Sequence, residues 1–243
     1  MSSGPAAPTA VRPRRVVTDR RGGRSASPYD SFNLGSHVGD DPAAVAANRA
    51  RLAGEIGVPG EQLVWMTQVH GTGVAIVEDA AENPVAGVDA LVTATPGLVL
   101  CVLVADCVPV LLADPVAGVV AAVHAGREGV RRGVVPAALA AMTRLGARPG
   151  DVEALLGPAV CGLDYEVPAA MQAEVARVAP ASAVRTRQRT PGLDLRAGIA
   201  EALRGAGVRQ VVHDPRCTVE DPRLFSHRRD GVTGRQAGVV WLG

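Results

Sequence analysis

Apolar and polar residues follow one another in a pattern that divides the chain into early strand-like runs and later helical ones. Apolar runs of strand length, bounded by turn residues, lie at 63–69, 74–77, 88–93, 98–104, 108–113 and 119–123. Helical spacing at about 130–145, 168–178 and 195–204 is interleaved with short strands at 154–156 and 210–213, and a last strand lies at 239–242. Because strands come first and helices later, we expect an α+β fold of layered helices and mixed and antiparallel sheets.

One helix is expected before these strands. Asp41 is a helix-capping residue, Pro42 suits the first helical position, and Gly57 ends the pattern, so we predict a helix over 43–56.

Composition narrows the expected organisation, location and partners. Residues 1–15 are rich in proline, alanine and serine before they turn basic, so we expect a disordered arm. The length of 243 residues allows either one large domain or two small subdomains. A net charge of +1, with two residues each of Trp, Tyr and Phe, offers nucleic acid little to bind. No apolar run approaches the ~18 residues of a membrane helix, and no secretory segment is evident. We therefore expect a cytoplasmic protein with no nucleic-acid or membrane partner.

Three residues are distinctive because each ends an apolar run and opens a turn. They are His70 in Gln68-Val69-His70-Gly71, Cys107 in Ala105-Asp106-Cys107, and His124 in Val123-His124-Ala125-Gly126. Two imidazoles and one thiolate suit zinc, and three protein ligands leave a fourth position for water or substrate. The trio predicts a catalytic metal site, since a closed structural site would need a fourth protein ligand.

A predicted hairpin between Cys107 and His124 shows whether these two ligands can lie close together. Asp114-Pro115-Val116-Ala117-Gly118 is a turn sequence between two apolar runs. If the chain folds back about the Pro115–Val116 bond, Cys107 pairs with His124, and directly opposed Cβ atoms lie ~5 Å apart. That distance suits two ligands of one metal, whereas a slip of one residue would place them on opposite faces.

The other cysteines differ from Cys107 in their surroundings. Cys101 lies inside a fully apolar run, where a thiol packs as a small hydrophobe. Cys107 follows an acid and precedes a turn, which is typical of a reactive thiol. Cys161 and Cys217 complete the set without a C-x-x-C pair, and we expect all four thiols to be reduced.

Polar residues in glycine-flanked loops supply further candidates, because functional groups tend to gather in loops. Arginine can hold phosphate through two parallel charge-assisted hydrogen bonds, which makes Arg49, Arg228 and Arg229 candidate phosphate ligands. For Arg49 the alternative is a charge on a helix surface. For Arg228 and Arg229 the alternative is a salt bridge within a hairpin loop.

Short motifs along the chain match one known family in order, from about residue 16 to the C-terminus. They include Tyr29 to Gly35, His37-Val38-Gly39-Asp40-Asp41-Pro42, Asn48-Arg49, Thr67-Gln68-Val69-His70-Gly71, Asp89-Ala90, Ala105-Asp106-Cys107, His124-Ala125-Gly126, Gly157-Pro158-Ala159, Tyr165-Glu166-Val167, Cys217-Thr218, Arg228-Arg229-Asp230-Gly231 and Thr233-Gly234-Arg235. The chain thereby resembles the YfiH-type laccase-domain proteins. The resemblance implies a single catalytic domain over 16–243. It also implies a layered α/β/β/α unit similar to the catalytic domain of cytotoxic necrotizing factors.

The chain departs from the family pattern at two places. Arg127 and Glu128 stand where the family often has a tryptophan and an arginine, and His227 stands where a tyrosine is common.

The resemblance also implies an activity, that of a zinc-dependent purine nucleoside phosphorylase with adenosine deaminase side activity. Adenosine, inosine and methylthioadenosine are the expected nucleosides, phosphate is the second substrate, and copper is the alternative metal. We expect a monomer or weak homodimer whose metal ligands fall on His70, Cys107 and His124. As a hypothesis, Cys107, His124, Asp106 and Glu166 act in catalysis, with Asp106 or Glu166 as proton carrier, and substrate and phosphate contact Arg49, Gln68, Tyr165, Arg228 and Arg229.

Three other interpretations start from the same residues. A four-copper oxidase needs many more imidazoles than the five histidines present, which nearly excludes it. A metal-free cysteine hydrolase would use Cys107 as nucleophile and His124 as its base. A non-catalytic module would bind its metal for structure alone.

Overall fold

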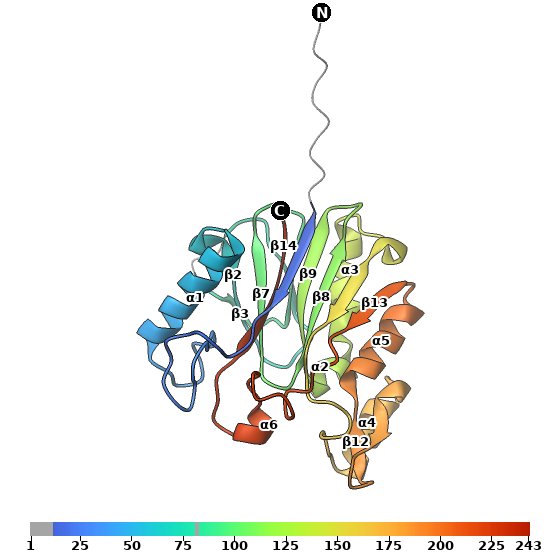
Figure 1. Cartoon of the computed structure of the whole chain (residues 1–243). Helices are drawn as coiled ribbons and strands as arrows, with labels where there is room; N and C mark the ends of the chain where they lie inside the picture. The colour runs from blue at the N-terminus through green and yellow to red at the C-terminus, as the bar shows by residue number, and fades with distance from the viewer. Residues whose placement is uncertain (1–11, 81–82) are drawn as a thin grey trace, which may run out of the picture.

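Two β-sheets stacked face to face carry the residues of interest (Figure 1). The computed structural model describes residues 12–80 and 83–243. The larger sheet has six strands in the order β13 (Gln210–His213), β10 (Glu153–Leu156), β8 (Val108–Asp114), β9 (Val119–Ala125), β6 (Ala90–Thr93) and β4 (Val74–Ile76). The smaller has four, in the order β1 (Pro13–Val17), β14 (Gln236–Leu242), β7 (Val99–Val104) and β2 (Leu63–Val64). Both sheets mix parallel and antiparallel pairs.

The described residues also form helices and two small two-stranded ribbons. The α-helices are α1 (Pro42–Ile56), α2 (Arg127–Arg132), α3 (Val134–Arg144), α4 (Ala169–Ala176), α5 (Leu195–Gly205) and α6 (His227–Asp230). Short 3-10 turns lie at Gly60–Gln62, Pro149–Asp151 and Pro180–Ser182. The ribbons pair β3 (Met66–Thr67) with β5 (Val85–Ala86), and β11 (Ala183–Arg185) with β12 (Pro191–Leu193).

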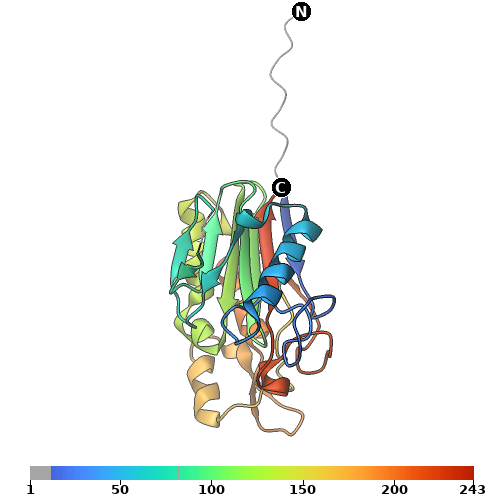
Figure 2. The same ribbon diagram turned by 90° about the vertical axis from the view of Figure 1, so that its left-hand side faces the viewer.

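Apolar side chains are buried in three layers. Leu100 and Leu111 lie in the layer between the two sheets. Met142 and Ile199, from α3 and α5, pack on the outer face of the six-stranded sheet. Leu52 of α1 packs on the outer face of the four-stranded sheet, and Figure 2 looks onto this helix. The order is α/β/β/α, so the expected layered α+β fold is confirmed.

The helix predicted over 43–56 is present, and one predicted helix is broken. Asp41 Oδ1 accepts a hydrogen bond from the Ala43 backbone at 2.9 Å, and Gly57 ends α1 with φ +73°. The helix predicted at 130–145 is instead α2 and α3, because Gly133 has φ +86° between them. Within residues 12–80 and 83–243, no helix has the length and apolar character needed to cross a membrane.

The prediction of a disordered arm is wrong for Pro13 to Arg15. These residues begin β1, which pairs antiparallel with β14, and Arg15 forms an ion pair with Glu153 at 3.1 Å. An edge strand keeps polar side chains in water on one side, so its pattern does not look like that of a buried strand. Residues 1–11 of the predicted arm lie outside the described residues.

The β8–β9 hairpin has a different register from the predicted one. His124 lies opposite Pro109 and Val108 opposite Ala125, so the prediction that Cys107 faces His124 directly is wrong. The loop holds four residues because Asp114 Oδ1 accepts hydrogen bonds from the Val116 and Ala117 backbones, both at 2.9 Å. The slip is two residues, which keeps both ligands on one face of the sheet.

Candidate active site

The three predicted metal ligands meet at one edge of the stacked sheets. Cys107 lies in the turn before β8 and His124 lies near the end of β9, so the hairpin brings them to the same edge. His70 arrives from the turn after β3. Figure 1 shows these strand ends near α2 and α6. His70 and Asp106 have φ of +57° and +91°, a backbone conformation that is rare outside glycine and that clusters at functional sites.

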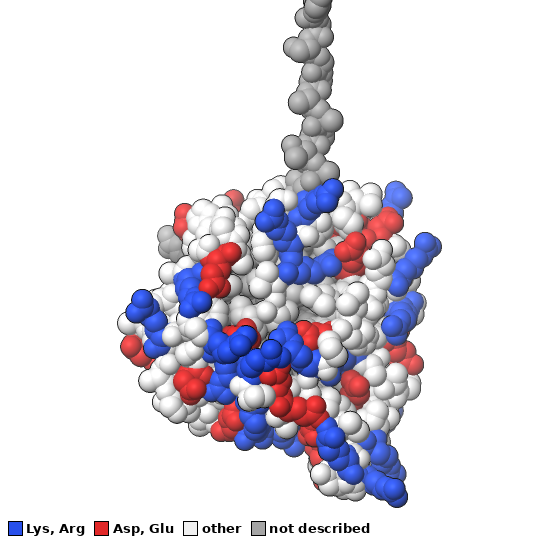
Figure 3. Space-filling model, in the orientation of Figure 1, with Lys and Arg blue, Asp and Glu red and all other residues white. Residues whose placement is uncertain are grey.

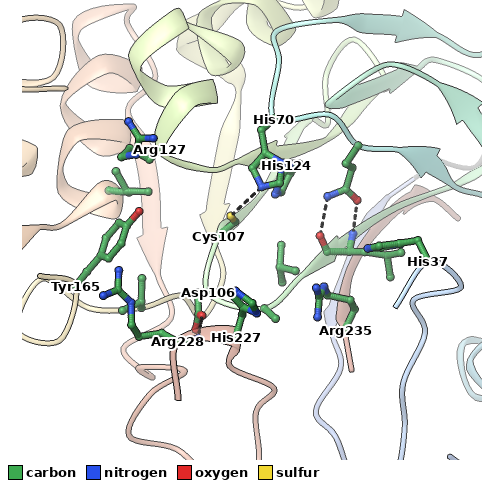
Figure 4. Close-up of a pocket in the computed structure, with 16 residues that line it drawn as sticks. His37, His70, Asp106, Cys107, His124, Arg127, Tyr165, His227, Arg228 and Arg235 are labelled. Carbon is green, nitrogen blue, oxygen red and sulfur yellow. Dashed lines mark hydrogen bonds between the residues drawn. The ribbon is translucent and has the colours of Figure 1, made fainter. Parts of the chain in front are cut away.

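The ligand atoms of this trio face one another (Figure 4). His70 Nε2 lies 3.9 Å from Cys107 Sγ, and the rings of His70 and His124 have centroids 4.7 Å apart. All three ligand atoms lie within 4.8 Å of one another. Nitrogen and sulfur ligands of a tetrahedral zinc are ~3.5 Å apart, so small side-chain movements would close the set around an ion. The donor types and their spacing fit zinc with three protein ligands.

Gly126 leaves room for these ligands. A Cβ atom at this position would lie 3.0 Å from Cys107 Sγ and 3.0 Å from His70 Cδ2, closer than side chains normally approach. Glycine is therefore required at position 126 because any side chain there would crowd the metal ligands.

Asp89 organises two of the ligands from behind. Its fully buried carboxylate accepts a hydrogen bond from His124 Nδ1 at 2.8 Å, and others from the backbones of His70 at 2.9 Å and Gly71 at 2.6 Å. Burial alone would raise the pKa of Asp89, but these hydrogen bonds and the His124 charge outweigh it and lower the pKa. The contact leaves Nε2 of His124 as the ring nitrogen available to a metal. No role was predicted for Asp89 from the sequence. Its place as an acid at the start of an apolar run was the signal that could have identified it.

Cys107 and His124 shift each other's pKa in opposite directions. Burial alone would raise the pKa of Cys107, but the His124 charge and hydrogen bonds with His124 and His70 outweigh it and bring the pKa to about 6. Burial alone would lower the pKa of His124, but Cys107 and Asp89 outweigh it and raise the pKa to about 9. Without a metal, the pair is therefore a thiolate and an imidazolium at neutral pH, and the thiolate is the form that binds metals.

A cavity of about 390 Å³ opens beside the trio. Around it lie Tyr165, Arg127 and Arg228 on one side, His37 and Arg235 on the other, and Asp106 and His227 between them (Figure 4). The guanidinium carbon of Arg228 lies 5.1 Å from the centre of the Tyr165 ring. Basic and acidic side chains are interleaved on the face drawn in Figure 3, so that face is not one broad basic surface. A concave site with a few convergent polar groups suits a small anionic or hydroxylated substrate.

The structure places four of the predicted catalytic and substrate residues on the cavity wall besides Cys107 and His124: Gln68, Asp106, Tyr165 and Arg228. Asp106 is fully engaged, because Thr218 and Ser226 hydroxyls donate to Oδ1 at 2.6 and 2.7 Å and the Arg228 backbone donates to Oδ2 at 2.6 Å. Gln68 exchanges two hydrogen bonds with the Leu103 backbone. Both side chains therefore act as anchors of the wall.

The structure does not bring Arg49, Arg229 or Glu166 to the cavity. Arg49 donates twice to the Leu34 carbonyl, at 3.0 and 2.8 Å, and its guanidinium carbon lies 4.1 Å from the centre of the Trp65 ring. Arg229 donates to backbone carbonyls of the 218–224 loop and pairs with its neighbour Asp230. Glu166 is exposed and its backbone forms an isolated bridge with Gly192.

Four histidine and arginine residues of the cavity had no predicted role: His37, Arg127, His227 and Arg235. His37 and Arg235 belong to motifs that carried the family resemblance, which was the available signal. Arg127 and His227 are two of the three residues at which the chain departs from the family pattern, and both line the cavity, whereas the third, Glu128, does not.

The chain combines a layered α/β/β/α unit with an open His–Cys–His ligand set beside a cavity that three arginines line. The chain belongs to the family whose model is described as multi-copper polyphenol oxidoreductase laccase, which matches residues 14–243. The resemblance to YfiH-type laccase-domain proteins is thereby confirmed.

Named relatives and solved structures agree with this assignment. The chain is 61% identical over 233 residues to a purine nucleoside phosphorylase of Mycobacterium tuberculosis, covering 96% of this chain and 93% of that one. It is 56% identical over 226 residues to a purine nucleoside phosphorylase of Streptomyces coelicolor, with 93% of each covered. The crystal structure of YlmD from Geobacillus stearothermophilus is similar with a TM-score of 0.89 and 33% identity, covering 97% and 94% of the two chains. The crystal structure of protein NMB0706 from Neisseria meningitidis is similar with a TM-score of 0.85 and 36% identity, covering 97% of this chain and 96% of that one.

Proposed function

We propose that this chain is a zinc-dependent purine nucleoside phosphorylase that also deaminates adenosine. One observation carries the proposal: an open His–Cys–His set faces a cavity with three arginines, in a chain 61% identical to a protein named purine nucleoside phosphorylase. The reaction moves the ribosyl group from purine to phosphate and gives free base and ribose 1-phosphate. Adenosine, inosine and methylthioadenosine are the proposed nucleosides. The proposal includes a cytoplasmic monomer or weak homodimer whose catalytic domain begins at β1.

Phosphate binding falls to cavity arginines in this proposal. Arg228 is exposed at the cavity, and no carboxylate of the described chain forms an ion pair with its guanidinium. Arg235 donates to the Thr233 and Gly234 carbonyls at 2.8 and 2.9 Å, which fixes its guanidinium in place. Arg127 is already paired with Glu128. We therefore assign phosphate chiefly to Arg228, with Arg235 as the second cation, because paired N–H groups match phosphate oxygens.

Tyr165, His37 and His227 are the groups proposed to meet the purine. Burial raises the pKa of Tyr165, so its hydroxyl stays protonated and can donate a hydrogen bond. His227 Nδ1 donates a hydrogen bond to the Gly231 carbonyl at 2.7 Å, and no residue within 12–80 or 83–243 forms a hydrogen bond with its Nε2. Because Asp106 already accepts three hydrogen bonds, His37 and His227 are better placed as proton carriers than Asp106.

The metal in this proposal is held by His70, Cys107 and His124. When bound, zinc supplies a Lewis acid that polarises substrate oxygen and makes water a stronger nucleophile for deamination. Asp89 holds the His124 ring in the orientation that the metal requires. Copper is the alternative metal, because it accepts the same nitrogen and sulfur donors and binds them tightly.

The proposal is tested by turnover of inosine and adenosine with and without phosphate, following purine base, ribose 1-phosphate and inosine separately. We expect phosphate-dependent release of base by the wild type and loss of it in Cys107→Ala. Cys101→Ala is the matched control, because Cys101 is buried in β7 away from the cavity and should leave turnover intact. Unchanged rates in Cys107→Ala would show that turnover does not require a metal bound at Cys107.

A metal-free cysteine hydrolase is the second candidate, because Cys107 and His124 form a thiolate–imidazolium pair. Full activity after exhaustive chelation, together with its loss on alkylation of Cys107, would favour that enzyme. A non-catalytic metal module would show no nucleoside turnover and would unfold when the metal is removed.

A further inference from the structure

A second group of metal-ligand residues lies outside the cavity. Cys161, Asp164, Cys217 and Glu220 offer four ligand atoms within 4.8 Å of one another. The first two lie in the loop between β10 and α4, and the others in the loop between β13 and α6. Residues far apart in the chain therefore converge, which distinguishes this cluster from neighbours that happen to share a turn.

Both thiols of this cluster point at one carboxylate oxygen. Cys161 Sγ donates to Asp164 Oδ2 at 3.1 Å, and Cys217 Sγ donates to the same oxygen at 3.4 Å. The Cys161 backbone N–H donates to Cys217 Sγ at 3.2 Å. Cys217 is 4% exposed, so its thiol depends on partners within the cluster. Two sulfurs and a carboxylate oxygen are thus held together at spacings close to those within one coordination shell.

Arg187 supplies the positive charge at this cluster. Its Nε donates to Asp164 Oδ1 at 3.1 Å, and its guanidinium also forms an ion pair with Glu220. The arginine side chain is 49% exposed, so it can move into solvent. Two carboxylates against one guanidinium leave a net negative charge, which still attracts a cation.

We propose that Cys161, Asp164, Cys217 and Glu220 form a structural site for a zinc ion. Thiolate ligands select zinc over magnesium and calcium, which prefer oxygen. Four protein ligands close the coordination shell, which is the pattern of a structural rather than a catalytic zinc. On binding, the two thiol protons pass to solvent, two sulfur–zinc bonds form, and Arg187 releases the carboxylates.

This zinc joins two loops that support the cavity. A parallel backbone bridge between Ala159 and Cys217 already holds the loops in register, so the ligands need little rearrangement. Tyr165 of the first loop lines the cavity, and Thr218 of the second donates to Asp106 Oδ1 at 2.6 Å. The ion stiffens the wall of the cavity without touching the reacting groups. This inference does not depend on the proposed activity.

Zinc content of the intact protein, purified without a histidine tag and dialysed against Zn²⁺, tests the proposal. We expect two zinc ions per wild-type chain, one for each ligand cluster. Cys161→Ser and Cys217→Ser should each bind one zinc and lose the rise in Tm that the second ion gives. Cys101→Ser is the matched control and should keep both.

The first cluster is tested separately in the same experiment. Cys107→Ser should lose the other ion and keep the one at Cys161 and Cys217, so failure of one site is distinguishable from failure of the other. A wild-type stoichiometry that Cys161→Ser and Cys217→Ser leave unchanged would overturn the inference. A Cys161–Cys217 disulfide found by mass spectrometry in the zinc-dialysed protein would overturn it as well.

Cobalt substitution and Arg187 provide an independent check. Co²⁺ bound to thiolates absorbs strongly in the near ultraviolet, and this band should shrink in Cys161→Ser. Arg187→Gln removes the guanidinium that competes for the carboxylates, so it should bind zinc severalfold more tightly than the wild type. Equal or weaker binding by Arg187→Gln would mean that the carboxylates serve only the arginine.

Discussion

Two clusters in this protein contain cysteine beside other metal ligands, and their neighbours give the sulfur opposite properties. Cys107 lies half-buried between imidazoles whose charge and hydrogen bonds outweigh the effect of burial, so its pKa is about 6. Cys161 lies half-buried beside Asp164, and burial together with that carboxylate raises its pKa to about 12. Both residues are only partly exposed, so the charge of the neighbours, rather than exposure, separates a thiolate from a thiol.

The clusters also differ in what surrounds them. The trio of His70, Cys107 and His124 has three ligands and opens on a cavity. The group around Cys161 has four ligands and an arginine in place of a cavity. An incomplete ligand set beside a cavity is suited to chemistry, and a complete set between loops is suited to holding them.

The largest expected difference is in thiol reactivity. After chelation of metals, Cys107 should react with iodoacetamide at a rate that falls as the pH drops through about 6, because its thiolate persists down to that pH. Cys161 should stay unmodified at neutral pH, so the two rates should differ more than ~1000-fold. Peptide mass spectrometry measures both rates. Similar rates for the two cysteines at pH 7 would erase the contrast drawn between the clusters.

Removal of the carboxylate behind the trio is expected to have the next largest effect. Asp89→Asn should lower metal affinity and phosphorolysis by ~10- to 100-fold, because His124 loses the partner that orients its ring. Metal titration and kinetics measure the two losses. Asp164→Asn is the matched control and should affect only the second ion. The assignment of Asp89 fails if Asp89→Asn binds metal at the cavity as tightly as the wild type.

Neighbouring arginines should respond differently to the same change. Arg228→Gln should raise KM for phosphate about tenfold, because a charge-assisted hydrogen bond is lost from substrate. Arg229→Gln should instead lower the free energy of unfolding by ~2 kcal/mol, because the carbonyls of Thr218, Asp221 and Leu224 lose their donor. Steady-state kinetics and urea denaturation separate these outcomes. A KM effect confined to Arg229→Gln would reverse the assignment.

The smallest expected effect concerns the anchor of α6. Ser226 Oγ donates to Asp106 Oδ1 at 2.7 Å and accepts from the Arg229 backbone at 3.1 Å, as the N-cap of the helix. Ser226→Ala should cost about 1 kcal/mol of stability and leave metal content unchanged. Thermal unfolding and elemental analysis measure both quantities. Loss of metal in this variant would show that the α6 anchor is coupled to the trio.

Much of the fold could be predicted from the sequence, because buried strands and amphipathic helices leave periodic patterns. The failures have local causes. The turn at Asp114 gains two residues through side-chain hydrogen bonds that no periodicity reports. Gly133 breaks a helix whose apolar pattern continues across it. Strand β1 tolerates Arg14 and Arg15 because it is an edge strand.

The candidate site was predicted unevenly for a related reason. His70, Cys107 and His124 could be selected because each interrupts an apolar run with a metal-binding side chain. Arg228 and Arg229 are adjacent, and only the direction of each side chain shows that the first reaches the cavity and the second serves backbone carbonyls. Such directions depend on tertiary contacts, which the sequence pattern does not contain.

X-ray absorption spectroscopy at the zinc edge identifies the ligands of the metal beside the cavity. The sample is Cys161→Ser protein loaded with one zinc ion per chain, so that only the trio at the cavity is occupied. We expect a shell of one sulfur at ~2.3 Å and imidazole nitrogens at ~2.0 Å, with a further light ligand completing the set. A shell without sulfur, or with two sulfurs, would contradict the claim that His70, Cys107 and His124 hold the metal.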